Sequence, residues 1–158
     1  TMDKRTFETK INQLIKKIEK RYLDNKESEI YFLNTNANQK LEIKNFIEGP
    51  WIYKRNNFYY LVYAGWCTKP EMIEYCIAAS PEGPWEYKGI IQGNAQNCFT
   101  THPGIIEYKG KSYFMSHNGS LPTGGSYRRA ITIDYMHYNE DGTIQKIEQT
   151  AEGVKPVQ

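Results

Sequence analysis

An internal repeat of short tyrosine-rich segments is the feature that most limits how this chain can fold. From residue 46 onward, runs of Tyr, Ile and Val are separated by turns rich in Asn and Gly. Sliding the sequence along itself lays residues 59–63 over residues 113–117. Each copy reads as strand, tight turn, strand, longer loop, strand, turn and strand. The repeat therefore predicts two consecutive units of four antiparallel strands.

Such units favour an all-β fold. The fourth strands are expected at residues 85–89 and 143–148, each entered by a Gly-containing turn. Four-stranded antiparallel units in series are typical of the blades of a β-propeller, although other β-meanders fit the same pattern. About two blades cannot close a propeller, and their exposed edges invite association. A second copy or a partner chain covering these edges is therefore expected.

Residues 1–44 differ from the repeat. Residues 6–24 have a helical period, and the apolar residues that form one stripe are Phe7, Ile11, Leu14, Ile15, Ile18 and Tyr22. An amphipathic helix is predicted there, followed by a short strand at residues 29–33. The predicted domains are therefore a helix and linker over residues 1–44 and a partial propeller over residues 45–158.

Composition and charge narrow the classes of function. The chain has 20 basic and 18 acidic residues, which gives no basic excess for binding nucleic acid. It contains no apolar run of the roughly 18 residues that a membrane span needs. The three cysteines, Cys67, Cys76 and Cys98, match no zinc spacing and are expected to be reduced and buried.

The N-terminus gives little information on location. Met2 is followed by the charged run Asp3-Lys4-Arg5, which is not a signal peptide. A cytoplasmic location is expected if Met2 is the natural start. A start inside a longer gene leaves the location open.

One pair of polar residues stands out within the repeat. The same shift pairs Glu48 with His102, and each is followed by a Gly and a Pro. In a propeller the first strand of each blade lines the central channel, so both side chains are expected to point towards the axis. A partly desolvated carboxylate there has a raised pKa and suits proton donation near neutral pH. The alternative is that Glu48 is only a turn residue before Gly49-Pro50.

An ordered set of motifs resembles glycoside hydrolase family 43. The segments that carry the resemblance are FIEGPWIYKRN (46–56), AASPEGPW (78–85), THPGIIE (101–107), YFMSH (113–117), YRRA (127–130) and YNEDGTI (138–144). Any one of these is a weak signal, but their order and spacing are similar to the family over about residues 45–156.

The resemblance implies a five-bladed propeller and inverting hydrolysis of arabinofuranosides or xylosides. Glu48 matches the general acid, and His102 matches a central histidine that holds calcium or ordered water in some members. Arg129, chosen over Arg128 because alternation lets only one face inward, matches an arginine that contacts substrate. His117 at the pocket rim and the aromatic Trp51 are further candidates for substrate contact. No cofactor other than calcium is implied. His102 as a core histidine, His117 as a packed strand residue and Arg129 as a surface ion-pair partner remain as alternatives.

The chain also departs from the family pattern. The two aspartates that the family uses as the base and as the group that tunes the acid have no match, since Asp3, Asp24 and Asp134 lie outside the corresponding motifs. A poorly active or inert chain is therefore expected, with arabinoxylan, arabinan or xylo-oligosaccharides as its carbohydrate partners. The alternative function is a non-catalytic carbohydrate-binding or interaction module on the same scaffold.

Overall fold

The computed structural model describes residues 29–31, 40–66 and 70–156. It divides into two compact units, residues 1–44 and 45–158. In the first unit, β1 (Glu29–Tyr31) pairs antiparallel with β2 (Lys40–Glu42), so the strand expected at 29–33 is present and slightly shorter. The helix predicted at residues 6–24 lies outside the described residues.

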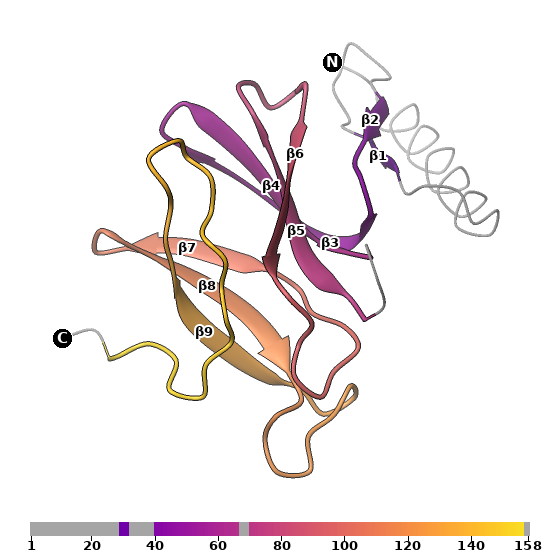
Figure 1. Cartoon of the computed structure of the whole chain (residues 1–158), viewed down its shortest axis with the longest axis vertical. Helices are drawn as coiled ribbons and strands as arrows, with labels where there is room; N and C mark the ends of the chain where they lie inside the picture. Colours follow the sequence, from indigo (N-terminus) through magenta and orange to yellow (C-terminus); the bar gives the residue numbers. More distant parts are fainter. Residues whose placement is uncertain (1–28, 32–39, 67–69, 157–158) are drawn as a thin grey trace, which may run out of the picture. The chain divides into compact units, whose positions relative to one another are not determined.

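The second unit begins with a four-stranded antiparallel sheet, as the repeat predicts (Figure 1). Its strands follow chain order: β3 (Phe46–Arg55), β4 (Phe58–Gly65), β5 (Met72–Ala78) and β6 (Glu86–Gln92). A two-residue turn joins β3 to β4, and Asn56 occupies the left-handed region there with a φ of 52°. Asn tolerates that region better than other residues with a side chain, which explains why the sequence turns at this point.

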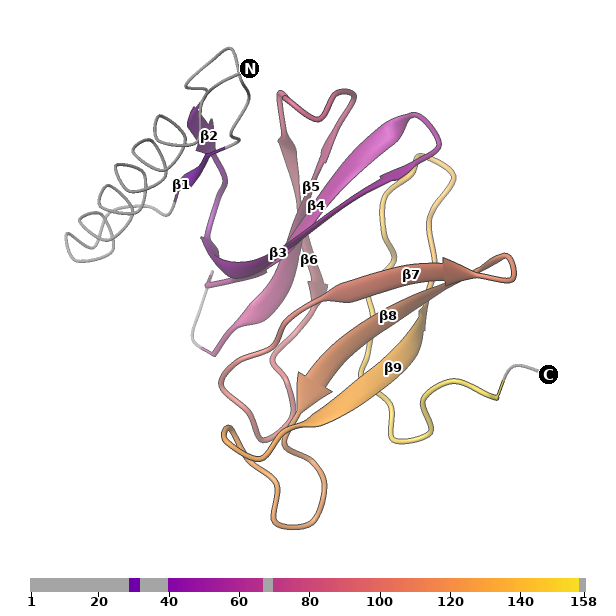
Figure 2. The same cartoon turned by 180° about the vertical axis from the view of Figure 1, so that it is seen from behind.

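A second antiparallel sheet contains three strands (Figure 2), β7 (Gly104–Tyr108), β8 (Lys111–Asn118) and β9 (Ala130–Met136). Lys109 and Gly110 join β7 to β8 with φ values of 48° and 72°. Two consecutive positive φ values define a type I′ hairpin turn, whose twist matches that of the flanking strands. The predicted all-β character therefore holds for the described residues, which contain no helix.

The fourth strand of the second sheet, predicted at residues 143–148, does not form. The backbone N–H of Ile147 instead donates to the carbonyl of Ile91 at the end of β6, with an N···O distance of 2.6 Å. The N–H of Ile144 donates to the hydroxyl of Tyr75 on β5. On the other side, the N–H of Gln145 donates to the carbonyl of His137 just after β9, and one isolated bridge pairs Ile144 with Tyr138, so the segment divides its backbone groups between the two sheets without forming a strand.

The register of the two hairpins corrects the repeat length. Arg55 pairs with Phe58 across the first turn, and Tyr108 pairs with Lys111 across the second. The offset from Arg55 to Tyr108 is one residue shorter than the shift that lays residue 59 over residue 113, so that shift is wrong by one position. Since side chains alternate between the faces of a strand, a slip of one residue exchanges the two faces. This offset does not extend to Glu48, because a β-bulge between Glu48 and Trp51 adds one residue to β3 before that position is reached.

The core of this unit lies between the two sheets. Tyr60, Val62 and Ala64 on β4 pack with Ile73, Tyr75 and Ile77 on β5, and Phe114 on β8 joins them from the second sheet. Tyr60 connects several parts of this core. Its ring stacks on Tyr53 with centroids 4.8 Å apart, and its hydroxyl donates to the carbonyl of Gly142 at 2.8 Å.

The second sheet has a buried face and an exposed face. Ile105 and Phe114 face the first sheet and are buried. On the opposite face, Ile131 is 77% exposed, and Ile106 and Ile133 are also exposed. One side of this sheet therefore presents a row of uncovered aliphatic side chains to water, as expected for a blade without a neighbour on that side.

Two smaller expectations can be compared with the structure. Cys76 and Cys98 are free and buried, whereas Cys67 lies outside the described residues. Burial raises the pKa of the Cys76 thiol to about 11, so this thiol is protonated at neutral pH. Among the described residues, no helix has the length and apolar character to cross a membrane.

Candidate active site

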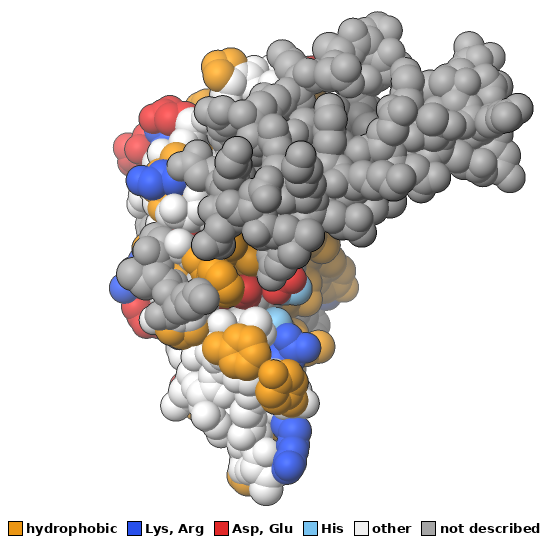
Figure 3. All heavy atoms as spheres, turned by 90° about the vertical axis from the view of Figure 1, so that its right-hand side faces the viewer, with side chains coloured by type: hydrophobic (Ala, Val, Ile, Leu, Met, Phe, Trp, Pro, Cys, Tyr) orange, Lys and Arg blue, Asp and Glu red, His pale blue; other side chains and the backbone are white. Residues whose placement is uncertain are grey.

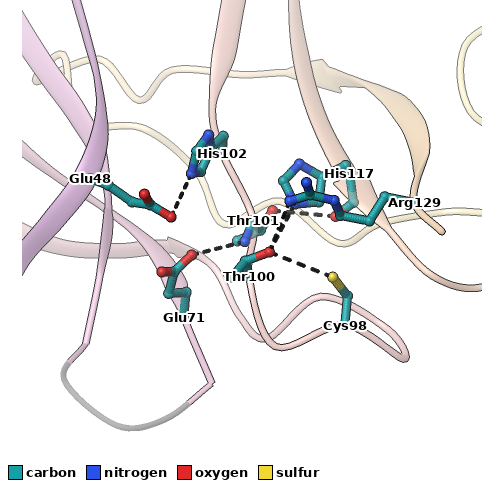
Figure 4. A network of polar contacts seen from close by, with 8 residues as sticks. All are labelled: Glu48, Glu71, Cys98, Thr100, Thr101, His102, His117 and Arg129. Carbon is teal, nitrogen blue, oxygen red and sulfur yellow. Dashed lines mark hydrogen bonds and ion pairs between the residues drawn. The ribbon is translucent and has the colours of Figure 1, made fainter. Parts of the chain in front are cut away.

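Glu48 and His102 meet at the start of the two sheets (Figure 4). Glu48 lies on β3, where the pairing with β4 is interrupted on both sides of it, and His102 lies just before β7. The Oε1 atom of Glu48 is 2.9 Å from Nε2 of His102, although this nitrogen makes no aligned hydrogen bond. Gly49 permits the approach: a Cβ there would stand 3.1 Å from the imidazole ring, and its φ of +60° also favours glycine.

A second carboxylate, Glu71, faces the same point from the residue before β5 (Figure 4). Its side chain is buried and accepts a hydrogen bond from the backbone N–H of Thr101 at 3.1 Å. Burial raises the pKa of the Glu71 carboxyl. The hydrogen bond from Thr101 opposes this shift, while the nearby Glu48 carboxylate adds to it. Ligand atoms of Glu48, Glu71 and His102 all lie within 4.8 Å of one another.

A basic pair adjoins these acids (Figure 4). The Nη1 atom of Arg129 is 3.3 Å from Nε2 of His117 and 3.2 Å from the hydroxyl oxygen of Thr100. A guanidinium group can only donate, so Nε2 of His117 must accept and the ring is neutral, with its proton on Nδ1. The pKa of His117 is lowered accordingly, first by burial and then by the charge of Arg129.

The two groups of residues are continuous. The rings of His102 and His117 have centroids 5.6 Å apart. Thr100 and Thr101 precede His102 in the chain, and each makes a hydrogen bond to part of the cluster. We call the set of Glu48, Glu71, Thr100, His102, His117 and Arg129 the polar cluster.

Buried hydrogen bonds support the polar cluster from behind. Gln92 donates to the hydroxyl of Thr101 and accepts from Ser116, while Gln149 donates to Ser116 and to the carbonyl of His117. Ser116 and Gln92 are almost inaccessible to water. Since buried polar groups are costly unless paired, this network restricts the conformations open to the strand that carries His117.

The structure brings most, but not all, of the residues singled out in the sequence into the polar cluster. Glu48, His102, His117 and Arg129 all belong to the polar cluster. Trp51 lies further along β3, opposite Val62, and is outside it. Arg128 points its Nη1 to the carbonyl of Thr123 in the loop before β9.

The sequence reasoning missed Glu71 and Thr100. Glu71 stands directly before the apolar run of β5, where an acidic residue is unusual, and this was the available signal. Thr100 gave no signal of its own.

Comparison with known proteins now identifies the family. The family model described as glycosyl hydrolases family 43 matches residues 2–144. The chain belongs to glycosyl hydrolase family 43. The match begins well before the first motif noted in the sequence, so it includes residues of both compact units.

Two curated relatives are described as glycosidases. The β-D-galactofuranosidase of Aspergillus niger is 34% identical over 116 residues, which is 70% of this chain and 34% of that protein. The xylosidase/arabinosidase of Bacteroides ovatus is 32% identical over 105 residues, or 66% of this chain and 31% of that protein. The chain thus spans about a third of the length of the curated relatives it matches.

Solved family 43 structures are similar over the same fraction. A β-xylosidase/α-arabinofuranosidase from a compost metagenome, solved with xylotriose in a calcium-free form, superimposes with a TM-score of 0.60 at 35% identity. It is matched over 66% of this chain and 31% of that one. A family 43 enzyme of Xanthomonas citri, solved with xylotriose, gives a TM-score of 0.62 at 30% identity, over 72% of this chain and 34% of that one.

Charged and hydrophobic side chains lie next to one another on the surface of this family 43 chain. Figure 3 shows acidic, histidine and basic side chains side by side on one face, with hydrophobic side chains next to them. Acidic, basic and apolar side chains therefore lie together on this face.

Proposed function

We propose that this chain supplies the general-acid part of a family 43 glycosidase that acts on xylose- or arabinose-containing oligosaccharides. The observation that carries the proposal is the convergence of Glu48 and His102 with His117 and Arg129 at one surface. The descriptions of the relatives as xylosidases and arabinosidases support the substrate class.

Glu48 is the proton donor in this proposal. Its side chain is 47% exposed, so a glycosidic oxygen can reach it. The carboxyl of the buried Glu71 lies beside it, and burial raises the pKa of Glu71. In an inverting glycosidase the acid protonates the leaving oxygen while a base on the opposite side of the sugar activates water.

Arg129 and His117 are the proposed sugar-binding pair. The guanidinium of Arg129 presents donors that sugar hydroxyls can accept, and His117 holds this group in place through its Nε2. Trp51, which lies outside the polar cluster, is proposed only as a contact for a more distant part of the substrate.

The base is expected to come from elsewhere. Asp134 accepts two hydrogen bonds from Thr150, and Asp141 accepts two from Thr143, so both of these aspartates on the described part of the chain are engaged in local structure. We therefore propose that catalysis needs a carboxylate from a further segment or chain, which would also cover the exposed sheet edges.

The isolated chain is expected to bind a monosaccharide weakly without hydrolysing glycosides. Saturation-transfer NMR with xylose and with arabinose measures the binding. Arg129→Ala should abolish the signal, whereas the change at its neighbour, Arg128→Ala, should retain it because the Arg128 side chain bonds to the loop. Equal signals in the two variants would contradict the assignment of Arg129.

Measurement of glycoside hydrolysis distinguishes the proposed glycosidase from a non-catalytic carbohydrate-binding module. The unchanged chain and Glu48→Gln are compared on nitrophenyl α-L-arabinofuranoside and β-D-xyloside. Activity that disappears in the variant would show that a working base exists in this chain. Sugar binding without turnover, and unaffected by Glu48→Gln even when a further segment supplies the proposed base, would favour the non-catalytic binding module.

Calcium is the proposed ion for this site, and the donor atoms fit a hard divalent cation in part. Glu48 and Glu71 offer carboxylate oxygens, which are the ligands that calcium prefers. One ligand atom from each of Glu48, Glu71 and His102 lies within 4.8 Å of the other two, which is about twice the usual calcium–oxygen distance. Glu71 and His102 would hold the ion, and Glu48 is not needed as a ligand. The ion would supply a fixed positive charge beside the acid.

Addition of calcium is therefore expected to raise the melting temperature of the chain. An ion that binds only the folded state adds about 2.7 kcal/mol of stability at 100 times its dissociation constant. Differential scanning fluorimetry with calcium, against EDTA, measures the shift. Glu71→Gln should remove it, and Glu107→Gln, which alters an exposed carboxylate paired with Arg55, should leave it unchanged. An equal shift in both variants would exclude Glu71 as a ligand.

A further inference from the structure

The two carboxylates of the polar cluster reach it from strands that are not neighbours in the first sheet. Glu48 lies on β3 and Glu71 directly precedes β5, while β4 lies between these strands. The pairing of β3 with β4 is interrupted on both sides of Glu48, so a regular ladder does not determine where this residue stands. The spacing of the two carboxylates therefore depends on contacts elsewhere along β3 and β5.

One such contact joins the starts of the two strands. The side-chain amide of Asn45, which directly precedes β3, donates to Oε2 of Glu74 on β5 at 2.9 Å. Asn45 comes three positions before Glu48, and Glu74 comes three positions after Glu71. The Asn45–Glu74 hydrogen bond thus reaches across β4 and links the two chain segments that carry the carboxylates.

Gly65 on β4 allows the Glu74 side chain to cross the middle strand. Gly65 pairs with Phe46 at the start of β3 and with Met72 at the start of β5. A Cβ at Gly65 would overlap Oε1 of Glu74. Any residue with a side chain at this position would therefore displace the Glu74 carboxylate, and its bond to Asn45 with it.

Glu74 is a buried carboxylate that the proposed mechanism does not use. Its side chain is inaccessible to water, and the hydroxyl of Tyr87 on β6 donates to the same Oε2 atom at 2.6 Å. A buried carboxylate is costly unless its oxygens accept hydrogen bonds, so the fold holds these donors close to it. The backbone of Asn45 is held as well, since its carbonyl accepts from the N–H of Trp66 at 3.0 Å.

We propose that Asn45 and Glu74 are positioning residues that set the spacing between the Glu48 and Glu71 carboxylates. This inference rests on the proposed function, in which Glu48 donates the proton. A hydrogen bond to a charged group is shorter and stronger than one between neutral groups, which suits it to fixing a distance. When this bond is lost, the start of β3 moves relative to β5, and Glu48 moves relative to both Glu71 and His102.

NMR spectroscopy of the full chain tests the inference without sugar and without turnover. The imidazole signals of His102 report the position of Glu48, because Oε1 of Glu48 lies 2.9 Å from Nε2 of this ring. The amide signal of Thr101 reports the position of Glu71, to which this amide donates. We call these the reporter signals. The signals of His137, which follows β9 outside the polar cluster, serve as an internal reference.

Substitutions on two different strands remove the contact. Asn45→Gly deletes the donor and keeps the backbone conformation, because glycine readily adopts the φ of 58° found there. Asn45→Asp keeps the size of the side chain and replaces its donor by an acceptor. Gly65→Ala displaces the Glu74 carboxylate from β4. All three variants should shift the reporter signals and leave the reference in place. Asn56→Gly is the matched control, since Asn56 also has a positive φ, of 52°, but follows the far end of β3.

The other outcomes contradict the positioning role in different ways. A lower melting temperature with unshifted reporter signals would mean that the bond only stabilises the fold, and would overturn the inference. Equal shifts in Asn56→Gly would overturn it too, because any change at an end of β3 would then have the same effect. The proposed function is tested separately by the turnover of Glu48→Gln. Its failure there, with shifted reporter signals, would overturn the role of Glu48 and leave the measured spacing role of Asn45 and Glu74 intact.

Discussion

Replacing Glu48 with Gln should lower the turnover of unactivated substrates by about 10²–10⁴-fold in a chimera that supplies the proposed base. Such a chimera is made by substituting residues 45–158 of this chain for the matching segment of the Bacteroides ovatus xylosidase/arabinosidase, which this chain matches over 31% of its length. Gln has the shape of Glu but cannot donate a proton as a carboxylic acid does. The loss should therefore fall on kcat with xylobiose as substrate.

The choice of leaving group separates a catalytic role from a structural one. Nitrophenolate leaves with little protonic assistance, so Glu48→Gln should affect nitrophenyl xyloside far less than xylobiose. A variant that merely disturbed the fold would slow both substrates alike. Glu107→Gln is the control, since Glu107 pairs with Arg55 at an exposed position outside the polar cluster. Full activity on xylobiose in Glu48→Gln would rule out Glu48 as the acid.

The second large effect is expected at Tyr60. Tyr60→Ala should destabilise the chain by about 3–5 kcal/mol, because it removes a fully buried ring from the contact between the two sheets. Total stabilities of domains are about 5–15 kcal/mol, so much of the variant should be unfolded at ambient temperature. Urea denaturation followed by circular dichroism measures the change.

Two further variants at tyrosines show where the energy at Tyr60 comes from. Tyr60→Phe keeps the stack on Tyr53 and loses only the hydrogen bond to the carbonyl of Gly142, which predicts a cost of about 1 kcal/mol. Tyr108→Ala alters an exposed ring and should change the stability by about 0.5 kcal/mol at most, as substitutions at surface positions generally do. A Tyr60→Ala loss as small as that of Tyr108→Ala would mean that the two sheets do not share one core.

The hairpins could be predicted because their turns carry local information. Asn56 and the pair Lys109-Gly110 adopt the backbone conformations that their positions in tight turns require. The fate of residues 143–148 could not be predicted in this way. Ile147 has the same apolar character whether it extends the second sheet or bonds to Ile91 on the first, and only the tertiary arrangement decides between them.

The repeat length shows a second limit of sequence comparison. The shift read from the sequence lays Tyr60 over Phe114, and these two aromatic residues do both enter the core. They enter it from opposite faces of equivalent strands, since each sheet turns a different face to the contact. Similarity of residue type therefore predicted the number of strands in the first sheet and the hairpins of both, but the wrong register.

Some residues of the candidate site could be predicted from the sequence, and others could not. Glu48, His102, His117 and Arg129 carry chemical character that draws attention in a sequence. Glu71 and Thr100 act through contacts with chain segments about 30 residues away, at Thr101 and Arg129 respectively, and no local pattern reports such contacts. The close approach of two loops at Gly119, where a Cβ would lie 2.4 Å from the carbonyl oxygen of Asn97, is likewise invisible without a structure.

The uncovered aliphatic face of the second sheet has a thermodynamic consequence. Ile106, Ile131 and Ile133 gain free energy only when another surface removes them from water. A separate molecule that covered them, such as another copy of the chain or a partner chain, would bind the folded state and not the unfolded one. Mass action then adds to the stability of the folded state as the covering surface becomes more concentrated. The free energy of unfolding measured on the dilute chain would then be a lower bound for the chain with this face covered.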